Sequence, residues 1–138
     1  MKLADSEADA AFEPYRLAYE DAWSPVSACA QFLEKTAHLP KVIVTNGERE
    51  QQLRKMLKCG ISSHVIATVT PMDCGHWKPS HGMFLAALAH LKVAPGRCLM
   101  IGDDLERDIR PASELGMKTF YVEPNNPLRT LLQAIDAT

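Results

Sequence analysis

The sequence predicts an α/β fold, a doubly wound parallel sheet with helices on both faces. Short β-branched or apolar runs alternate with segments of helical periodicity, and proline and glycine separate the two kinds of segment. Polar residues come directly after the apolar runs, which is where ligands bind in such sheets. The 138 residues amount to one domain of ordinary size. We expect residues 1–24 to form a helical N-terminal segment and residues 25–138 to form the α/β core.

Two helices are predicted before the first strand. Aromatic residues recur at spacings of three and four within 7–23, which indicates a helix. Pro14 lies inside this segment, so we expect the helix to start near it or to bend there. Ser24 and Pro25 have the pattern of an N-cap followed by proline at the first helical position. They predict a second helix that ends near His38.

The first half of the core alternates strand, helix and strand. Pro40 ends the preceding helix, and KVIVT at 41–45 is a β-branched run typical of a buried parallel strand. A helix is predicted at 48–58 from its apolar spacing, and Gly60 is placed to cap its end. VIATV at 65–69 is the second predicted strand.

The second half of the core repeats this alternation. A loop rich in proline and glycine leads to a helix at 80–91, and the apolar run RCLMI at 97–101 is the third predicted strand. Acidic residues open a helix predicted at 102–116. KTFYV at 118–122 is the fourth strand, and a last helix is expected at 127–137. We expect all of these short strands to be buried on both faces.

Composition excludes several classes of protein. The net charge is −2 and Lys and Arg form no run, which argues against nucleic acid or an anionic membrane as partner. The apolar runs are far shorter than the roughly 20 residues of a membrane span, and the first residues contain no apolar signal region. The cysteines show no CxxC spacing and are expected to be reduced thiols: Cys29, Cys59, Cys74 and Cys98. We therefore expect a cytoplasmic protein.

The first motif, Thr45-Asn46-Gly47, comes directly after the first predicted strand. A hydroxyl and successive backbone N–H groups at the end of a strand that leads into a helix can form a cradle for phosphate. Asn-Gly is also a frequent turn pair, so an ordinary turn is the alternative interpretation.

The second motif, Lys78-Pro79-Ser80, comes after the second predicted strand and its loop. Pro79 disfavours helix at Lys78 and fixes the start of the next helix, so the lysine is held at the rim. Its ammonium could neutralise a phosphate or a carboxylate. A solvated surface lysine is the alternative.

The third motif, GDDLERD at 102–108, comes after the third predicted strand. Clustered carboxylates at a strand end suit Mg²⁺, which takes one or two of them and keeps several waters. Acidic residues also favour the positive end of a helix dipole, so a helix start is the alternative. This alternative accounts well for Asp104 and Glu106 and less well for Asp103, which lies at the strand tip.

Taken in order, these motifs resemble motifs two, three and four of the haloacid dehalogenase (HAD) superfamily, and ASELGMKT at 112–119 is similar to the segment after motif four in that family. The resemblance covers residues 25–124, most of the core. It implies a HAD-type, Rossmann-like fold. It also implies a Mg²⁺-dependent phosphatase, a hydrolase of the phosphate ester of a small metabolite that works through an aspartyl-phosphate intermediate.

The resemblance assigns roles to individual residues. Thr45 would hydrogen-bond the phosphoryl oxygens, with Asn46 helping to shape the cradle. Lys78, as the catalytic lysine, would balance the charges of phosphate and nucleophile. Asp103 would be a metal ligand, supported by Asp108. Such chemistry needs the negative charge of an attacking carboxylate and of its substrate to be offset by metal and lysine.

The family's first motif, an apolar strand ending in Asp-x-Asp-x-Thr that supplies the attacking aspartate, does not occur in this sequence. Asp5 and Asp9 are four apart and come after no apolar strand, so we do not take them as replacements. Residues 3–7 resemble those that commonly come just after this motif. Our hypothesis is a truncated gene, a wrong start site or an internal deletion. We expect a core without its first strand and a helical cap reduced to a remnant.

Three hypotheses for function are open at this point, and so is the question whether the chain is an enzyme. It is a HAD-like hydrolase by descent whose catalysis is impaired, a non-catalytic module that binds phosphate or Mg²⁺ through Thr45, Lys78 and Asp103, or a protein-interaction module. In the family the missing strand is central, so its loss would leave open strand edges that invite a homodimer. A phosphorelay receiver domain fits poorly, because its acidic residues come in a different order.

Overall fold

The computed structural model describes residues 5–125 and 128–137. Its helices are α1 (Asp5–Asp21), α2 (Cys29–Lys35), α3 (Arg49–Lys58), α4 (Pro71–Cys74), α5 (His81–Leu91), α6 (Arg110–Glu114) and α7 (Arg129–Asp136). Its strands are β1 (Val42–Val44), β2 (Ala67–Val69), β3 (Leu99–Gly102) and β4 (Lys118–Tyr121). This alternation confirms the predicted α/β class. None of the helices in the described ranges is long and apolar enough to cross a membrane.

The strands form two parallel pairs instead of one continuous sheet. β1 pairs with β2, with Ile43 opposite Thr68, and β3 pairs with β4, with Ile101 opposite Phe120. Among the described strands, β1 and β3 are not hydrogen-bonded to each other. The doubly wound sheet is therefore present as two halves, and within the described residues β1 and β3 each have a hydrogen-bonded strand along one edge only.

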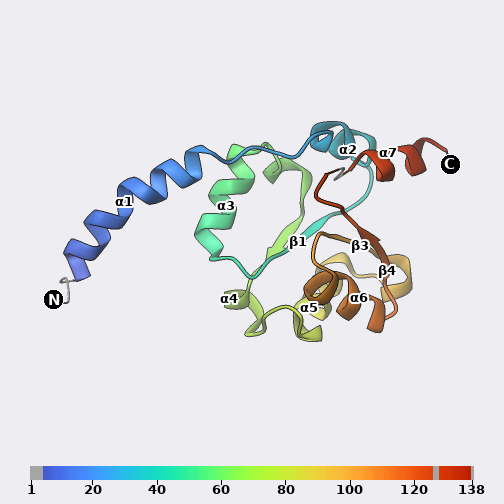
Figure 1. Ribbon diagram of the computed structural model, residues 1–138. Coiled ribbons are helices and arrows are strands. Elements are labelled where there is room, and N and C mark those ends of the chain that lie inside the picture. The colour runs from blue at the N-terminus through green and yellow to red at the C-terminus, as the bar shows by residue number, and fades with distance from the viewer. Residues whose placement is uncertain (1–4, 126–127, 138) are drawn as a thin grey trace.

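One hydrophobic core supports both strand pairs. Val44 of β1 and Met100 of β3 both pack against it, although no strand pairing joins β1 to β3. Figure 1 shows α5 and α6 on one side of the strands and α2 and α7 on the other. The largest share of the core comes from α5. The buried residues of this core are Val69, Met83, Phe84, Ala87, Leu88, Ala112 and Met117.

The strands are less buried than predicted. Leu99 at the start of β3 is 45% exposed, and every residue of β1 is only partly buried. The prediction that the four strands are buried on both faces is therefore wrong, because Val69 is the only one of their residues that is buried. Each has a hydrogen-bonded neighbour on one side only, and the open edge leaves adjoining side chains accessible to water.

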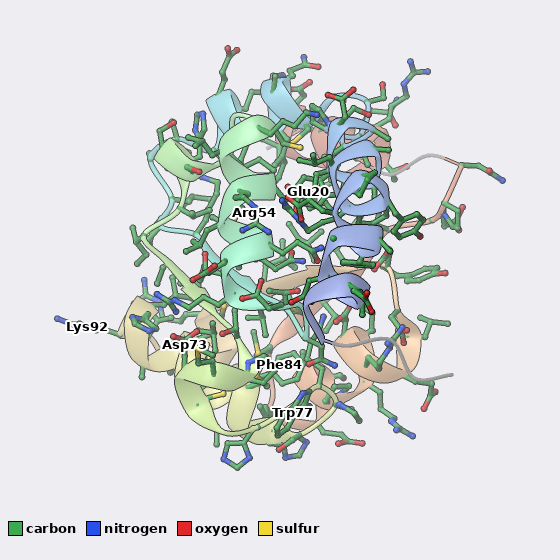
Figure 2. All side chains as sticks on the ribbon, turned by 90° about the vertical axis from the view of Figure 1, so that its left-hand side faces the viewer. Glu20, Arg54, Asp73, Trp77, Phe84 and Lys92 are labelled. Carbon is green, nitrogen blue, oxygen red and sulfur yellow. The ribbon has the colours of Figure 1, made fainter. Side chains whose placement is uncertain are left out.

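The helix predicted at 7–23 is α1, which begins and ends two residues earlier and continues through Pro14. Figure 1 shows α1 extending away from the rest of the molecule. Its last turn is held to α3, where the Arg54 Nη2 atom donates to Glu20 Oε1 at 2.9 Å (Figure 2). The division of the chain at residue 24 stays a prediction.

The second helix begins later than predicted, at Cys29 and not at Pro25. Ala28, directly before it, has a φ of 66°, the left-handed conformation, and a residue in that conformation cannot continue a right-handed helix. The helix also ends at Lys35, before His38. Ser24 and Pro25 therefore do not start the helix, because a turn lies between Pro25 and Cys29.

The later helices agree better with the sequence. The helix predicted at 80–91 is α5, and Ser80, its predicted first residue, caps it by accepting a hydrogen bond from the N–H of Gly82. The segment predicted as one helix at 102–116 is a π-helical turn, Leu105–Ile109, followed by α6. Helix α4, in the loop before Lys78, was not predicted. The last helix begins at Arg129, and the predicted start at Pro127 lies outside the described residues.

Candidate functional site

Three segments meet at one end of the two strand pairs: the one after β1, the one before α5 and the one after β3. Asn46, just after β1, is hydrogen-bonded to Lys78, which lies before α5. Lys78 in turn pairs with Asp108, which packs against Gly102 at the end of β3. The carboxyl ends of β1 and β3 are thus linked through one lysine. The structure brings together the three motifs that the sequence singled out.

Thr45 and Gly47 form a tight turn after β1. The N–H of Gly47 donates to the Thr45 hydroxyl oxygen at 3.0 Å. A β-carbon at Gly47 would collide with the Gln52 side chain, so this position has room only for glycine unless Gln52 moves. The motif therefore does form a turn, as the alternative interpretation states, but the turn does not prevent a contact with phosphate. The hydroxyl accepts in this contact, and its own hydrogen remains available to donate to a phosphoryl oxygen.

The Asn46 carboxamide holds the backbone of Lys78 at both of its ends. Its Oδ1 atom accepts from the Lys78 N–H at 2.7 Å, and its Nδ2 atom donates to the Lys78 carbonyl at 3.1 Å. Sequence reasoning missed this contact, because the two residues are 32 apart along the chain and no pattern links them. The pair of bonds fixes where the lysine leaves the loop.

Lys78 and Asp108 form a buried ion pair. The Lys78 Nζ atom lies 2.6 Å from Asp108 Oδ1, and the two side chains are only 15% and 5% exposed. The other oxygen, Oδ2, accepts from the backbone N–H of Asp104 at 3.3 Å. The alternative of a solvated surface lysine is therefore wrong. Burying an ion pair has its own desolvation cost, but removing either partner would leave an uncompensated buried charge, which costs more.

Asp103 and Asp104 have different surroundings. Asp104 accepts hydrogen bonds from the N–H groups of Glu106 and Arg107 at 3.0 and 2.8 Å, and also pairs with the Arg107 guanidinium. The bond from the Arg107 backbone is the main reason why the pKa of Asp104 lies below its usual value. Asp104 is therefore the helix cap that the alternative interpretation described. Asp103 is exposed at the tip of β3.

The described residues do not form a complete set of metal ligands. Within residues 5–125 and 128–137, no group of three His, Cys, Asp or Glu side chains is placed to hold a metal ion. Asp103 offers an exposed carboxylate, while both oxygens of Asp108 are engaged. Mg²⁺ needs only one or two protein carboxylates and completes its shell with water, so Asp103 fits this cation. The assignment of Asp103 and Asp108 as metal ligands stays a prediction.

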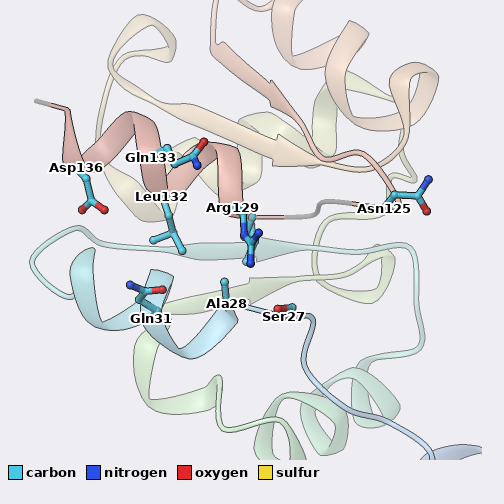
Figure 3. Close-up of a pocket in the computed structure, with 9 residues that line it drawn as sticks. Ser27, Ala28, Gln31, Asn125, Arg129, Leu132, Gln133 and Asp136 are labelled. Atoms are coloured by element: carbon cyan, nitrogen blue, oxygen red, sulfur yellow. The ribbon is translucent and has the colours of Figure 1, made fainter.

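A separate cavity of about 770 Å³ lies between α2 and α7 (Figure 3). Figure 3 shows Arg129 pointing from the start of α7 toward Ala28. None of the residues that the sequence singled out lines this cavity. Helix α7 is joined to α2 here by an ion pair between Lys35 and Asp136.

Comparison with known proteins shows which family this chain resembles. A HAD-hydrolase-like family model matches residues 76–137. The chain is 31% identical to a ribulose-1,5-bisphosphate 5-phosphatase from Halopiger xanaduensis over 82% of its own length and 48% of the relative's. It is 33% identical to the human N-acylneuraminate-9-phosphatase over 76% of its length and 43% of the relative's. The chain thus spans less than half the length of these two relatives.

Solved structures give the same answer for the fold. A HAD phosphatase from Thermococcus onnurineus superposes with a TM-score of 0.67 at 28% identity, covering 72% of this chain and 47% of that one. The HAD hydrolase YfnB from Bacillus subtilis, solved with bound magnesium, superposes with a TM-score of 0.81 at 20% identity, covering 90% and 60%. The predicted Rossmann-like fold is confirmed, and the chain belongs to the haloacid dehalogenase superfamily.

Proposed function

We propose that this chain is the phosphate-binding core of a Mg²⁺-dependent HAD phosphatase that acts on a small phosphorylated metabolite. The observation that carries the proposal is the buried pair of Lys78 and Asp108, which the hydrogen bonds from Asn46, the residue after Thr45, hold at the ends of β1 and β3. The Halopiger and human relatives are phosphatases of small phosphorylated compounds, which supports the substrate class. The free thiols of the four cysteines are compatible with a cytoplasmic location.

In this proposal each residue has a separate task. The Thr45 hydroxyl donates to a phosphoryl oxygen. The Lys78 ammonium offsets the charge of the phosphoryl group, and Asp108 keeps that ammonium in place. Asp103 holds Mg²⁺, which supplies further neutralisation of the phosphoryl charge. The pair is buried, so solvent screens the lysine's charge weakly.

The attacking carboxylate is not among the residues that meet at this site. No Asp-x-Asp-x-Thr sequence occurs in the 138 residues. We propose that the chain by itself binds phosphate with Mg²⁺ and hydrolyses phosphate esters poorly. Efficient catalysis then needs a carboxylate from another polypeptide segment.

The test combines binding and turnover. Binding of inorganic phosphate is measured by calorimetry with Mg²⁺ and with EDTA, and hydrolysis of p-nitrophenyl phosphate is measured in parallel. We expect phosphate binding that needs Mg²⁺. It should be weakened about tenfold or more in T45V, since a hydrogen bond to a charged group contributes about 1.5–3 kcal/mol. It should also be weakened in D103A, which lacks the carboxylate that holds Mg²⁺. Hydrolysis should not exceed that of D103A. Absence of phosphate binding would refute the proposal, and Mg²⁺-dependent turnover would place a nucleophile within this chain.

A second candidate, a role in protein association, is favoured by the unpaired edges of β1 and β3. Such edges present free N–H and C=O groups that pair readily with another strand. We propose that two copies of the chain associate through these edges. Light scattering coupled to size-exclusion chromatography should give a mass that rises from one to two chains with concentration. A constant monomer mass would remove this candidate.

A further inference from the structure

One N–H and the carbonyl oxygen of the Asn46 side chain are hydrogen-bonded to the backbone of Lys78. Oδ1 accepts from the Lys78 N–H, and Nδ2 donates to the Lys78 carbonyl. A carboxamide has two N–H donors and one carbonyl, so this two-point contact uses both ends of the group. A contact of this kind fixes position and orientation together.

We propose that the Asn46 side chain has a positioning role, acting through Lys78 without itself contacting the phosphoryl group. Its target, the backbone of Lys78, carries the side chain that reaches Asp108 at 2.6 Å. Asn46 comes after β1 and Asp108 comes after β3, so the line from Asn46 through Lys78 to Asp108 crosses between two strands that share no hydrogen bonds. At this end of the strands, side-chain contacts thus link the two strand pairs, as backbone hydrogen bonds link the two strands within each pair.

This proposal rests on the proposed function only for the task of the Lys78 ammonium. The clamp itself can be tested without any ligand, by amide hydrogen exchange. We expect the Lys78 N–H to be protected in the native chain and to exchange at least tenfold faster in N46A. In N46D, whose carboxylate retains the acceptor, protection should persist. The N–H of Val122, which donates to the Gly102 carbonyl at 2.8 Å in the other half-sheet, is the control and should be unchanged.

If Lys78 and Val122 lose protection together in N46A, Asn46 is merely a stabilising residue and the proposal is wrong. It is equally wrong if the exchange of Lys78 does not change. These outcomes do not depend on phosphate, so they separate failure of the clamp from failure of the proposed function.

Phosphate binding in the presence of Mg²⁺ then distinguishes positioning from direct contact. If Asn46 acts through Lys78, N46A should weaken binding in the native background but not further in a K78M background. N46D should bind more tightly than N46A, because it keeps the bond to the Lys78 N–H. If Asn46 instead touched the phosphate, the two losses would multiply, and the negative charge of N46D would make it the weaker binder. Either result would overturn the proposal.

Discussion

Gly102 illustrates how a single residue shapes the site. A β-carbon built there would lie 2.5 Å from the Cβ atom and 2.6 Å from the Oδ2 atom of Asp108. Real side chains do not approach so closely, so the absence of a side chain at the end of β3 is what allows the Asp108 carboxylate to reach Lys78. The sequence shows a glycine before two aspartates, and it does not show which aspartate the glycine accommodates.

We therefore expect G102A to destabilise the chain by about 1–3 kcal/mol, the usual cost of overpacking a buried position. It should also weaken phosphate binding, because Asp108 must shift away from Lys78. Denaturant unfolding followed by circular dichroism measures the first effect. The matched control is G96A, where the nearest atom to an added β-carbon is the Gly116 carbonyl oxygen at 3.8 Å. Equal stability of G102A and G96A would contradict the account.

At the scale of elements, α4 is a short helix held by its own cap. The Thr70 N–H and hydroxyl both donate to Asp73 Oδ2, at 2.8 and 2.7 Å. The Arg49 guanidinium pairs with the other carboxylate oxygen and ties α4 to the start of α3. The hydroxyl bond from Thr70, together with the weaker effects of the backbone bond and the charge of Arg49, lowers the pKa of Asp73 below its usual value.

A lowered pKa in the folded state means that ionised Asp73 contributes stability above its unfolded value of about 3.9. That contribution is lost as the pH falls through the folded value. D73N should thus be less stable than the native chain at neutral pH, and the difference should shrink below about pH 4. Thermal unfolding from pH 7 to pH 3 measures this. D9N, at an exposed position of α1, serves as control, and a difference for D73N that does not change with pH would contradict the assignment.

The elements also show what sequence reasoning can and cannot supply. Periodicity and capping residues located α3, α5 and the four strands, because these signals act within a few residues. The start of α2 was misplaced because Ala28 adopts a left-handed turn that no local pattern indicates. The positions of the motifs relative to the predicted strands indicated that Thr45, Lys78 and Asp103 lie at the same end of the strands. The contact of Asn46 with Lys78 and the burial of Asp108 depend on packing across the chain, which local patterns do not encode.

At the scale of the whole molecule, α5 supplies most of the buried residues of the core against which residues of both strand pairs pack. Phe84 and Met83 are fully buried, and residues of β1 and β3 pack against the cluster that they form. With no hydrogen bonds between β1 and β3, the relative position of the two halves depends on this core and on the contacts of Lys78.

F84A should therefore cost about 3–5 kcal/mol, as expected for emptying a fully buried phenylalanine site. It should also lower the cooperativity of unfolding, since the two halves would lose their common support. L85A, which changes the neighbouring residue of the same helix at a 51% exposed position, is the matched control and should be close to native. A denaturant midpoint shared by both variants would show that the halves are held together by something other than this core.

The two tryptophans lie in places that make them natural optical reporters. Trp77, directly before Lys78, is 60% exposed, whereas the Trp23 indole N–H is buried without a hydrogen-bond partner in the described structure. The Lys55 Nζ atom lies 5.6 Å from the Trp23 ring centroid, where α1 meets α3. Emission from Trp77 should thus be red-shifted and respond to ligand at the site. Emission from Trp23 should be blue-shifted and should change only when α1 leaves α3.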